Sequence, residues 1–180
     1  MDRTGGWLLA MVLVGSQAAG GVVTEGSNPC SDTPHCAIAG PFRAEVAEVI
    51  SGRSGKRYVV RTTLRFTNLS DRPIRLGYKA RSGSATDELG NRYANEGSDR
   101  NRVRGIGYVT SRAADPQLVL GPGESRSASF ESSLWVYRGT RVGTVWNYAL
   151  TIDLLEILPS RQVRTIQEYS VGFTHLTTTS

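Results

Sequence analysis

Apolar and polar residues alternate along several short stretches of this chain, which is the pattern of β-strands that bury one face. The clearest stretch is RYVVRTTLRFTN, whose more apolar face carries Tyr58, Val60, Thr62, Leu64 and Phe66. A helix would not gather these residues on one side, and the three threonines and two valines of the run also favour a strand. We therefore expect a half-buried strand here.

A second alternating run follows the turn-forming segment NLSDRP, with Ile74, Leu76 and Tyr78 on one face. Arg75 and Lys79 alternate with them on the other face. Two such runs joined by a short turn predict one of two arrangements. They form either an antiparallel hairpin or a corner at which the chain passes between the two sheets of a sandwich.

Further short runs of strand-like residues occur in FRAEVAEVI, GIGYVT, SRSASF, VWNYALTIDLLEI and QVRTIQEYSVGF. The 20 glycines and 7 prolines interrupt the chain often, and no long helical pattern or internal repeat is present. The fold class predicted is all-β, an immunoglobulin-like antiparallel β-sandwich of about seven to eight strands over residues 41–173, followed by a flexible tail at 174–180. The expected core consists of Val60, Leu64, Phe66, Leu76, Tyr78, Phe130, Trp146, Tyr148, Leu150 and Ile152.

The first residues have the features of an export signal. Arg3 precedes an apolar stretch, Trp7–Gly15, that is too short to span a bilayer comfortably. Small residues at Ser16 and Ala18 suit a signal peptidase, so we expect residues 1–18 to be a signal peptide. The remaining chain contains no candidate transmembrane segment. The mature protein is therefore expected in a periplasm or outside the cell.

Two cysteines, Cys30 and Cys36, lie in an arm at residues 19–40 that is rich in Gly, Ser, Asn and Pro. Because exported proteins form disulfides, we expect these cysteines to be bonded to each other. The alternative is a metal site made by both thiolates with His35 and Asp32. Their spacing matches no zinc pattern, so the disulfide is the preferred interpretation.

A group of polar residues in the segment DELGNRY can be explained in two ways. Gly90 allows a turn with positive φ, Asp87 can accept hydrogen bonds from the turn backbone, and Glu88 would then be solvated. Alternatively, Asp87 and Asn91 could bind calcium together with Asp99. Several arginines in the following segment oppose a cation, so the turn is the preferred explanation and no metal is expected.

Three turn motifs resemble those of a known group of domains. They are FTNLSDRPI with Thr67 and Asn68; Asp87, Gly90, Asn91 and Tyr93 in TDELGNRY; and Pro122, Gly123 and Glu124 in LGPGES. In this order they resemble the bacterial extracellular immunoglobulin-like domains of the DUF4352 group. The resemblance spans residues 42–173 and implies a sandwich fold, but it brings no catalytic residues with it.

The net charge of +5 makes a basic surface a candidate for partner binding. If the two strands around residues 58–81 pair, their non-core side forms a basic face that would suit an anionic partner. The residues of this expected face are Arg61, Arg65, Arg75, Lys79 and Arg81. Because no aromatic residues are interleaved with them, nucleic acid is not the expected partner. The alternative interpretation is a solvated face that prevents edge-to-edge aggregation.

A polar segment at residues 94–104 is longer than a minimal connection and is expected to be a surface loop. It would be either a recognition element or a tolerated insertion. Its candidate recognition residues are Asn95, Glu96, Asp99, Arg100, Asn101, Arg102 and Arg104.

These patterns together favour a function in binding. The only histidines, His35 and His175, lie in the cysteine loop and the tail, and no phosphate-binding loop precedes a helix. We therefore expect no enzyme and no cofactor, but a domain that binds a protein or an anionic envelope component. The alternatives are a structural subunit of an envelope or extracellular assembly and, more weakly, a hydrolase or hydrolase inhibitor.

Overall fold

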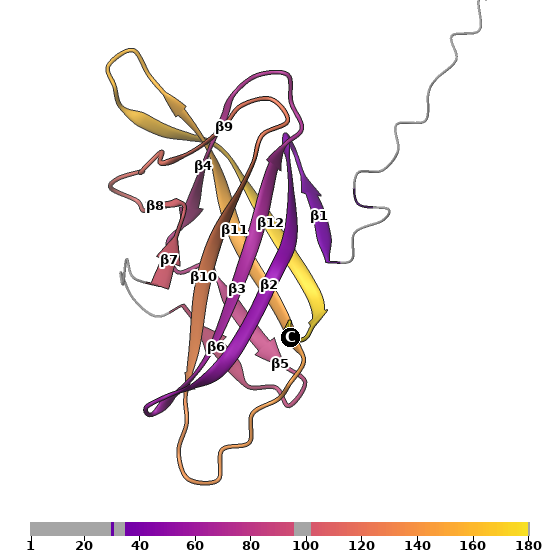
Figure 1. Cartoon of the computed structure of the whole chain (residues 1–180). Coiled ribbons are helices and arrows are strands. Elements are labelled where there is room, and N and C mark those ends of the chain that lie inside the picture. The colour runs from indigo at the N-terminus through magenta and orange to yellow at the C-terminus, as the bar shows by residue number, and fades with distance from the viewer. Residues whose placement is uncertain (1–29, 31–34, 96–101, 180) are drawn as a thin grey trace, which may run out of the picture.

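Twelve β-strands make up the described part of the chain, which in this computed structural model comprises residues 30, 35–95 and 102–179. The strands are arranged in two layers that pack face to face (Figure 1). The all-β antiparallel sandwich predicted from the alternating pattern is therefore confirmed. The number of strands is larger than the expected seven to eight, because short strands also form in segments that lack a clear alternation.

The first layer is built from four strands that pair antiparallel in the order β1-β2-β3-β10. Their bounds are β1 Cys36–Ala39, β2 Phe42–Ser54, β3 Arg57–Asn68 and β10 Ser125–Trp135. Two very short strands, β6 (Arg92–Ala94) and β7 (Val103–Arg104), pair with the other edge of β10.

The second layer has β11 (Trp146–Ile157) at its centre. One edge of β11 pairs with β12 (Val163–Leu176), and the other pairs with β4 (Ile74–Lys79) and β5 (Ser84–Asp87). The outer edge of β4 pairs antiparallel with β9 (Leu118–Leu120) and parallel with β8 (Gly107–Val109). The β5–β6 hairpin joins the two layers along one side, since β5 pairs with β11 and β6 with β10.

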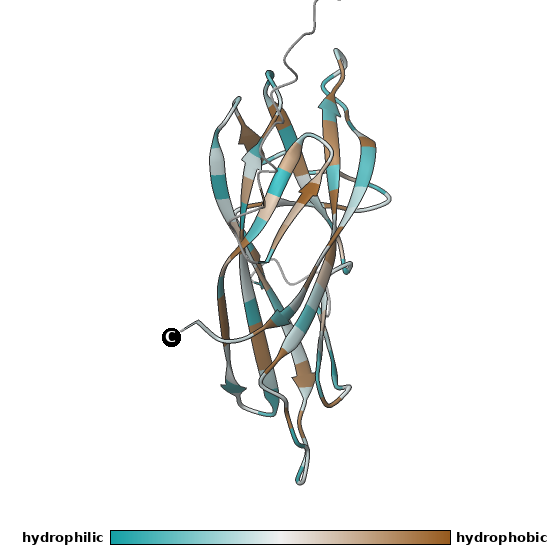
Figure 2. Ribbon diagram, turned by 90° about the vertical axis from the view of Figure 1, so that its right-hand side faces the viewer, coloured by the Kyte–Doolittle hydropathy of each residue, from teal (hydrophilic) through white to brown (hydrophobic). Residues whose placement is uncertain are grey.

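The core lies between the layers and is lined by the inward residues of each alternating strand, a pattern visible along the ribbons in Figure 2. All ten residues predicted for the core are buried. One pair of aromatic rings connects the layers directly: the ring of Tyr78 on β4 lies 5.2 Å from that of Phe130 on β10. Within the first layer, the ring of Phe130 lies 6.4 Å from that of Phe66 on β3. Such pairs add to the apolar burial that stabilises the sandwich.

The segment between β3 and β4 is a corner and not a hairpin. Asn68, the last residue of β3, donates hydrogen bonds from its side-chain amide to the carbonyls of Arg72, Leu120 and Gly121 at 2.8–3.1 Å. Its side-chain oxygen accepts the N–H and the hydroxyl of Ser70. This buried amide therefore fixes the turn by which the chain leaves the first layer for the second.

Along the chain, the sandwich begins before and ends after its expected limits, residues 41–173. Strand β1 forms inside the arm expected at 19–40, and its first residue carries the disulfide Cys30–Cys36, which confirms the predicted pairing. At the other end β12 continues to Leu176, which is buried, and the N–H of Thr179 donates to the carbonyl of Val49 at 3.0 Å. The expected flexible tail is thus wrong for residues 174–179, because Leu176 completes the core.

Candidate binding cleft

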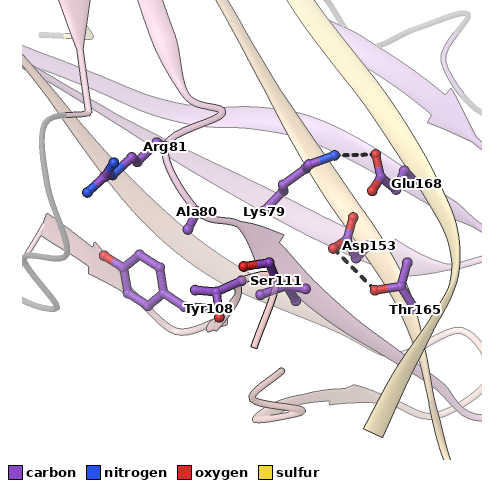
Figure 3. A pocket seen from close by; sticks show the side chains of 10 residues that line it. Lys79, Ala80, Arg81, Tyr108, Ser111, Asp153, Thr165 and Glu168 are labelled. Carbon is purple, nitrogen blue, oxygen red and sulfur yellow. Dashed lines mark hydrogen bonds and ion pairs between the residues drawn. The ribbon is translucent and has the colours of Figure 1, made fainter. Parts of the chain in front are cut away.

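A cleft of about 650 Å³ opens on the outer face of the second layer (Figure 3). It is lined by residues 79–81 at the end of β4, residues 108–111 at the end of β8, Asp153 on β11, and Thr165 and Glu168 on β12. We call it the outer cleft. It has the dimensions of a site for a small molecule or for a few residues of a partner chain.

Asp153 is the most unusual residue of the outer cleft, because its carboxyl group is buried on the outer side of a sheet. Only 1% of the residue is exposed. One carboxyl oxygen, Oδ2, lies 3.4 Å from the hydroxyl of Thr165, which is long for such a bond. The other, Oδ1, has no hydrogen-bond partner among the described residues. Burial raises the pKa of Asp153, and the nearby charge of Glu168 raises it further.

An ion pair borders the cleft beside this buried acid. The ammonium of Lys79 bonds the carboxylate of Glu168, and both side chains are about half exposed. The hydrogen bond to Glu168 raises the pKa of Lys79. Exposed pairs of this kind contribute little to stability, so the pair can be rearranged at small cost when a ligand binds.

Gly77 on β4 allows one wall of the cleft to form. A side chain at this position would lie 2.4 Å from Cγ2 of Val109 and 2.9 Å from Cδ1 of Leu155, both of which are buried. Without a Cβ, the end of β8 can close over the outer face of the sheet. Val109 then becomes part of the cleft lining, as Asp153 is.

The expected basic face does not form as one surface. Strand β3 pairs with β2 and β10, whereas β4 pairs with β11, β8 and β9, so the two strands lie in different layers. Arg61 and Arg65 on β3 form ion pairs with Glu131 and Glu45 at 3.0 and 3.2 Å. Arg75 and Lys79 lie on β4, and Lys79 and Arg81 line the outer cleft. The assumption that these strands pair was wrong, because alternation within a strand does not identify its neighbour.

The polar residues around Asp87 form a turn, which is the interpretation preferred from the sequence. Its carboxylate accepts hydrogen bonds from the backbone N–H groups of Leu89, Asn91 and Gly143, from the Asn91 amide and from the Tyr93 hydroxyl, all within 3.1 Å. Gly90 has the expected positive φ of 83°. Burial pulls the pKa of Asp87 upward, but the hydrogen bonds from Asn91, Gly143 and Tyr93 outweigh it, so the pKa lies below its ordinary value. Five donors occupy the oxygens that calcium would need, and Asp99 lies outside the described residues.

The expectation that Glu88 is merely solvated is wrong. Its carboxylate accepts the N–H groups of Thr144 and Val145 at 2.8 and 3.0 Å, and these bonds lower its pKa. Asp87 and Glu88 together therefore hold the connection between β10 and β11, residues 136–145, against the β5–β6 turn. The sequence gives no sign of this role, because the partners lie more than fifty positions away.

The predicted recognition loop at residues 94–104 is described only at its ends. There it belongs to the sheets: Asn95 is buried, Val103 is buried in β7, and Arg102 donates to the hydroxyl of Ser133 at 2.9 Å. Arg104 is exposed. The candidate residues Glu96, Asp99, Arg100 and Asn101 lie outside the described residues. The prediction of a surface loop over all of residues 94–104 is thus wrong, because Asn95 and Val103 are both buried.

Sequence reasoning missed Asp153, Thr165, Glu168 and Tyr108 as residues of a common site. A signal was present, because Asp153 is the acid inside the otherwise apolar segment IDLL, between Ile152 and Leu154. An acid surrounded by apolar neighbours is a reason to look for a buried or functional carboxyl group.

Comparisons with known proteins assign this chain to no family. No family model matches the chain, and no curated protein matches it. A solved structure described as Northeast Structural Genomics Consortium target SoR45 shares 16% identity over 75% of this chain and 89% of its own, with a TM-score of 0.42. The ASH or PapD-like domain 7 of human CEP192 shares 10% identity over 78% and 89% of the two chains, with a TM-score of 0.29. At these TM-scores, neither similarity adds to what the strand topology itself establishes.

Proposed function

We propose that this chain is an exported, non-catalytic binding domain whose ligand site is the outer cleft. The observation that carries the proposal is the buried carboxyl group of Asp153, which has one oxygen without a partner among the described residues and lies in the cleft lining. A buried acceptor that lacks a donor costs free energy, and a ligand that supplies the donor removes this cost. The cleft therefore selects a ligand with an N–H or ammonium group.

A segment of another protein fits this chemistry better than an anionic envelope component does. A polypeptide offers N–H donors together with carbonyl acceptors for Lys79 and Arg81 near the cleft mouth. A purely anionic group would instead approach Asp153 and Glu168, which repel it when they are ionised.

Two features support export. The N-terminal residues have the composition of a signal peptide, and the Cys30–Cys36 disulfide is of a kind that persists in oxidising compartments. No helix formed by the described residues is long and apolar enough to cross a bilayer.

The replacement Asp153→Leu tests the proposal, because it removes the acceptor while keeping the number and branching of the side-chain heavy atoms. NMR titration of the unmodified protein with n-butylammonium and N-methylacetamide should shift the backbone resonances of Lys79, Val109 and Asp153, and acetate should not. The variant should lose these shifts, yet unfold at the same or a higher temperature, because the buried carboxyl group that lacked a donor is gone. Asp71→Leu, which removes an exposed acid at the β3–β4 corner, is the matched control and should bind normally.

A cross-linking experiment then asks whether the natural ligand is a protein. A photoreactive amino acid in place of Ser111, an exposed residue of the lining, should capture a discrete partner in the native compartment. The same group in place of exposed Thr86, on β5, should not capture it. Capture at Ser111 that persists in the Asp153→Leu background would contradict the proposed site, as would equal probe shifts in that variant.

A further inference from the structure

One end of the sandwich collects basic and aromatic side chains that the outer cleft does not use. At this end lie the β2–β3 turn, the β5–β6 turn and the β10–β11 connection, which form the lower end of the molecule in Figure 1. We call this surface the basic aromatic tip. Its residues are Arg53, Lys56, Arg138, Arg141, Trp135 and Tyr137.

Two of the three segments at the tip carry charge of one sign. Residues 52–57 and 135–145 include five cationic side chains and no Asp or Glu. Elsewhere in the described chain, Arg61, Arg65 and Lys79 pair with glutamates. The acids nearest to the β10–β11 connection are Asp87 and Glu88, and their oxygens are already occupied by hydrogen bonds from that connection and from their own turn. The cations of the tip thus face outward without acidic neighbours on their own segments.

Large apolar groups are exposed among these cations. Tyr137 is 75% exposed, Leu89 at the β5–β6 turn is 56% exposed, and Trp135 is 42% exposed. The guanidinium carbon of Arg57 lies 4.4 Å from the centroid of the Trp135 ring, so a cation and an aromatic face are presented together. Tryptophan, tyrosine and basic residues in one exposed surface match the headgroup region of a bilayer, where amphipathic rings and cations are both stabilised.

The tip is held in shape before any partner arrives. The N–H of Val136 donates to the carbonyl of Lys56 at 2.9 Å, and Tyr137 and Thr140 close a turn through two bonds of 2.9 and 3.1 Å. The Asn91 amide donates to the carbonyl of Arg141 at 2.9 Å. Because these contacts already order the connection, binding would cost little additional conformational entropy.

We propose that the basic aromatic tip docks on the surface of an anionic lipid bilayer, with Trp135 and Tyr137 in the headgroup region and the cations against lipid phosphates. A polyanionic glycan or nucleic acid would satisfy the charges but would leave the exposed Leu89 and Tyr137 without an apolar environment. A bilayer satisfies both kinds of group. The surface is separate from the outer cleft, so a protein docked in this way could still bind a ligand there.

Vesicle flotation of the chain, purified as the cell processes it, tests the proposal. We expect binding to vesicles of phosphatidylcholine with about one quarter phosphatidylglycerol, little binding to phosphatidylcholine alone, and loss of binding when salt is raised to about 0.5 M. The double variant Arg138→Gln/Arg141→Gln should bind about 25-fold more weakly, at about fivefold for each cation near the surface. Arg72→Gln/Arg112→Gln removes the same charge from exposed residues outside the tip and should bind as the unmodified protein does.

Fluorescence separates insertion at the tip from attraction by charge alone. In the chain without residues 1–18, which include Trp7, brominated lipids should quench Trp135 and the quenching should disappear in Trp135→Phe, since the remaining tryptophan, Trp146, is 2% exposed in the core. Equal loss of binding in both double variants would show that net charge and not the tip is responsible. Binding to soluble dextran sulfate without binding to anionic vesicles would assign the tip to a polyanion and overturn the proposal.

Discussion

Replacement of Asp87 by alanine is expected to be among the most destabilising single changes at the surface turns of this protein. The carboxylate accepts five hydrogen bonds, and two of their donors belong to buried residues: the hydroxyl of Tyr93 and the N–H of Gly143. Each buried donor left without a partner costs about 1–3 kcal/mol. The other donors, from Leu89 and Asn91, are nearer to solvent and can bond to water. We therefore expect the free energy of unfolding to fall by about 3–5 kcal/mol.

Urea unfolding followed by tryptophan fluorescence measures this loss, because Trp146 lies opposite Asp87 in the β5–β11 pairing. With a slope of about 2 kcal/mol per M, the midpoint should fall by about 1.5–2.5 M. Asp87→Asn keeps the shape of the side chain, but its NH₂ group replaces one acceptor oxygen and faces N–H or O–H donors. Its urea midpoint should therefore fall by about half as much as that of Asp87→Ala. Glu88→Gln is the neighbouring control and should change the midpoint much less, since its donors are exposed. A midpoint in Asp87→Ala within 0.3 M of the unmodified protein (about 0.6 kcal/mol) would refute the reasoning.

The pH dependence provides an independent check on the same residue. The pKa of folded Asp87 lies below its ordinary value, so the unfolded chain binds the proton more readily. The stability contributed by the carboxylate is therefore present above the ordinary aspartate pKa of about 4 and is lost as the pH falls through the folded value. The unmodified protein should lose stability over this acid range, and Asp87→Asn should lose less. Parallel stability curves for the two proteins would contradict this assignment.

Three further changes follow from the packing. Trp146→Ala should lower the free energy of unfolding by about 3–5 kcal/mol in the same urea assay, and an unchanged midpoint would mean that the residue is not in the core. Gly77→Ala should lower the melting temperature, because its Cβ would overlap Val109, and it should also reduce probe binding in the outer cleft; a variant that melts normally would exclude this close contact. Replacing both Cys30 and Cys36 by serine should cost about 2 kcal/mol from the short loop that they close, and free thiols in natively isolated protein would contradict the bond.

The fold class could be predicted from the sequence because its main signal is local. Whether a strand buries one face is visible in the residues of that strand alone, as the run from Tyr58 to Phe66 shows. The same holds for most of the turn at Asp87, whose carboxylate accepts four of its five hydrogen bonds from residues two to six positions away, and for the Cys30–Cys36 disulfide, which spans six positions. Interactions of such short range leave their pattern in consecutive residues.

The pairing of strands, and with it the functional surfaces, was decided only by the tertiary structure. Alternation shows that β3 and β4 each have a polar face but does not show that a corner sends them to different layers, so the predicted basic face divided between two surfaces. Asp153 became a buried acid because residues from the ends of β4 and β8 and from the neighbouring strand β12 surround it. Glu88 binds the β10–β11 connection because this connection returns to it more than fifty residues later in the chain. In each case the deciding neighbour is distant in sequence, and only the packing of the complete chain brings it into contact.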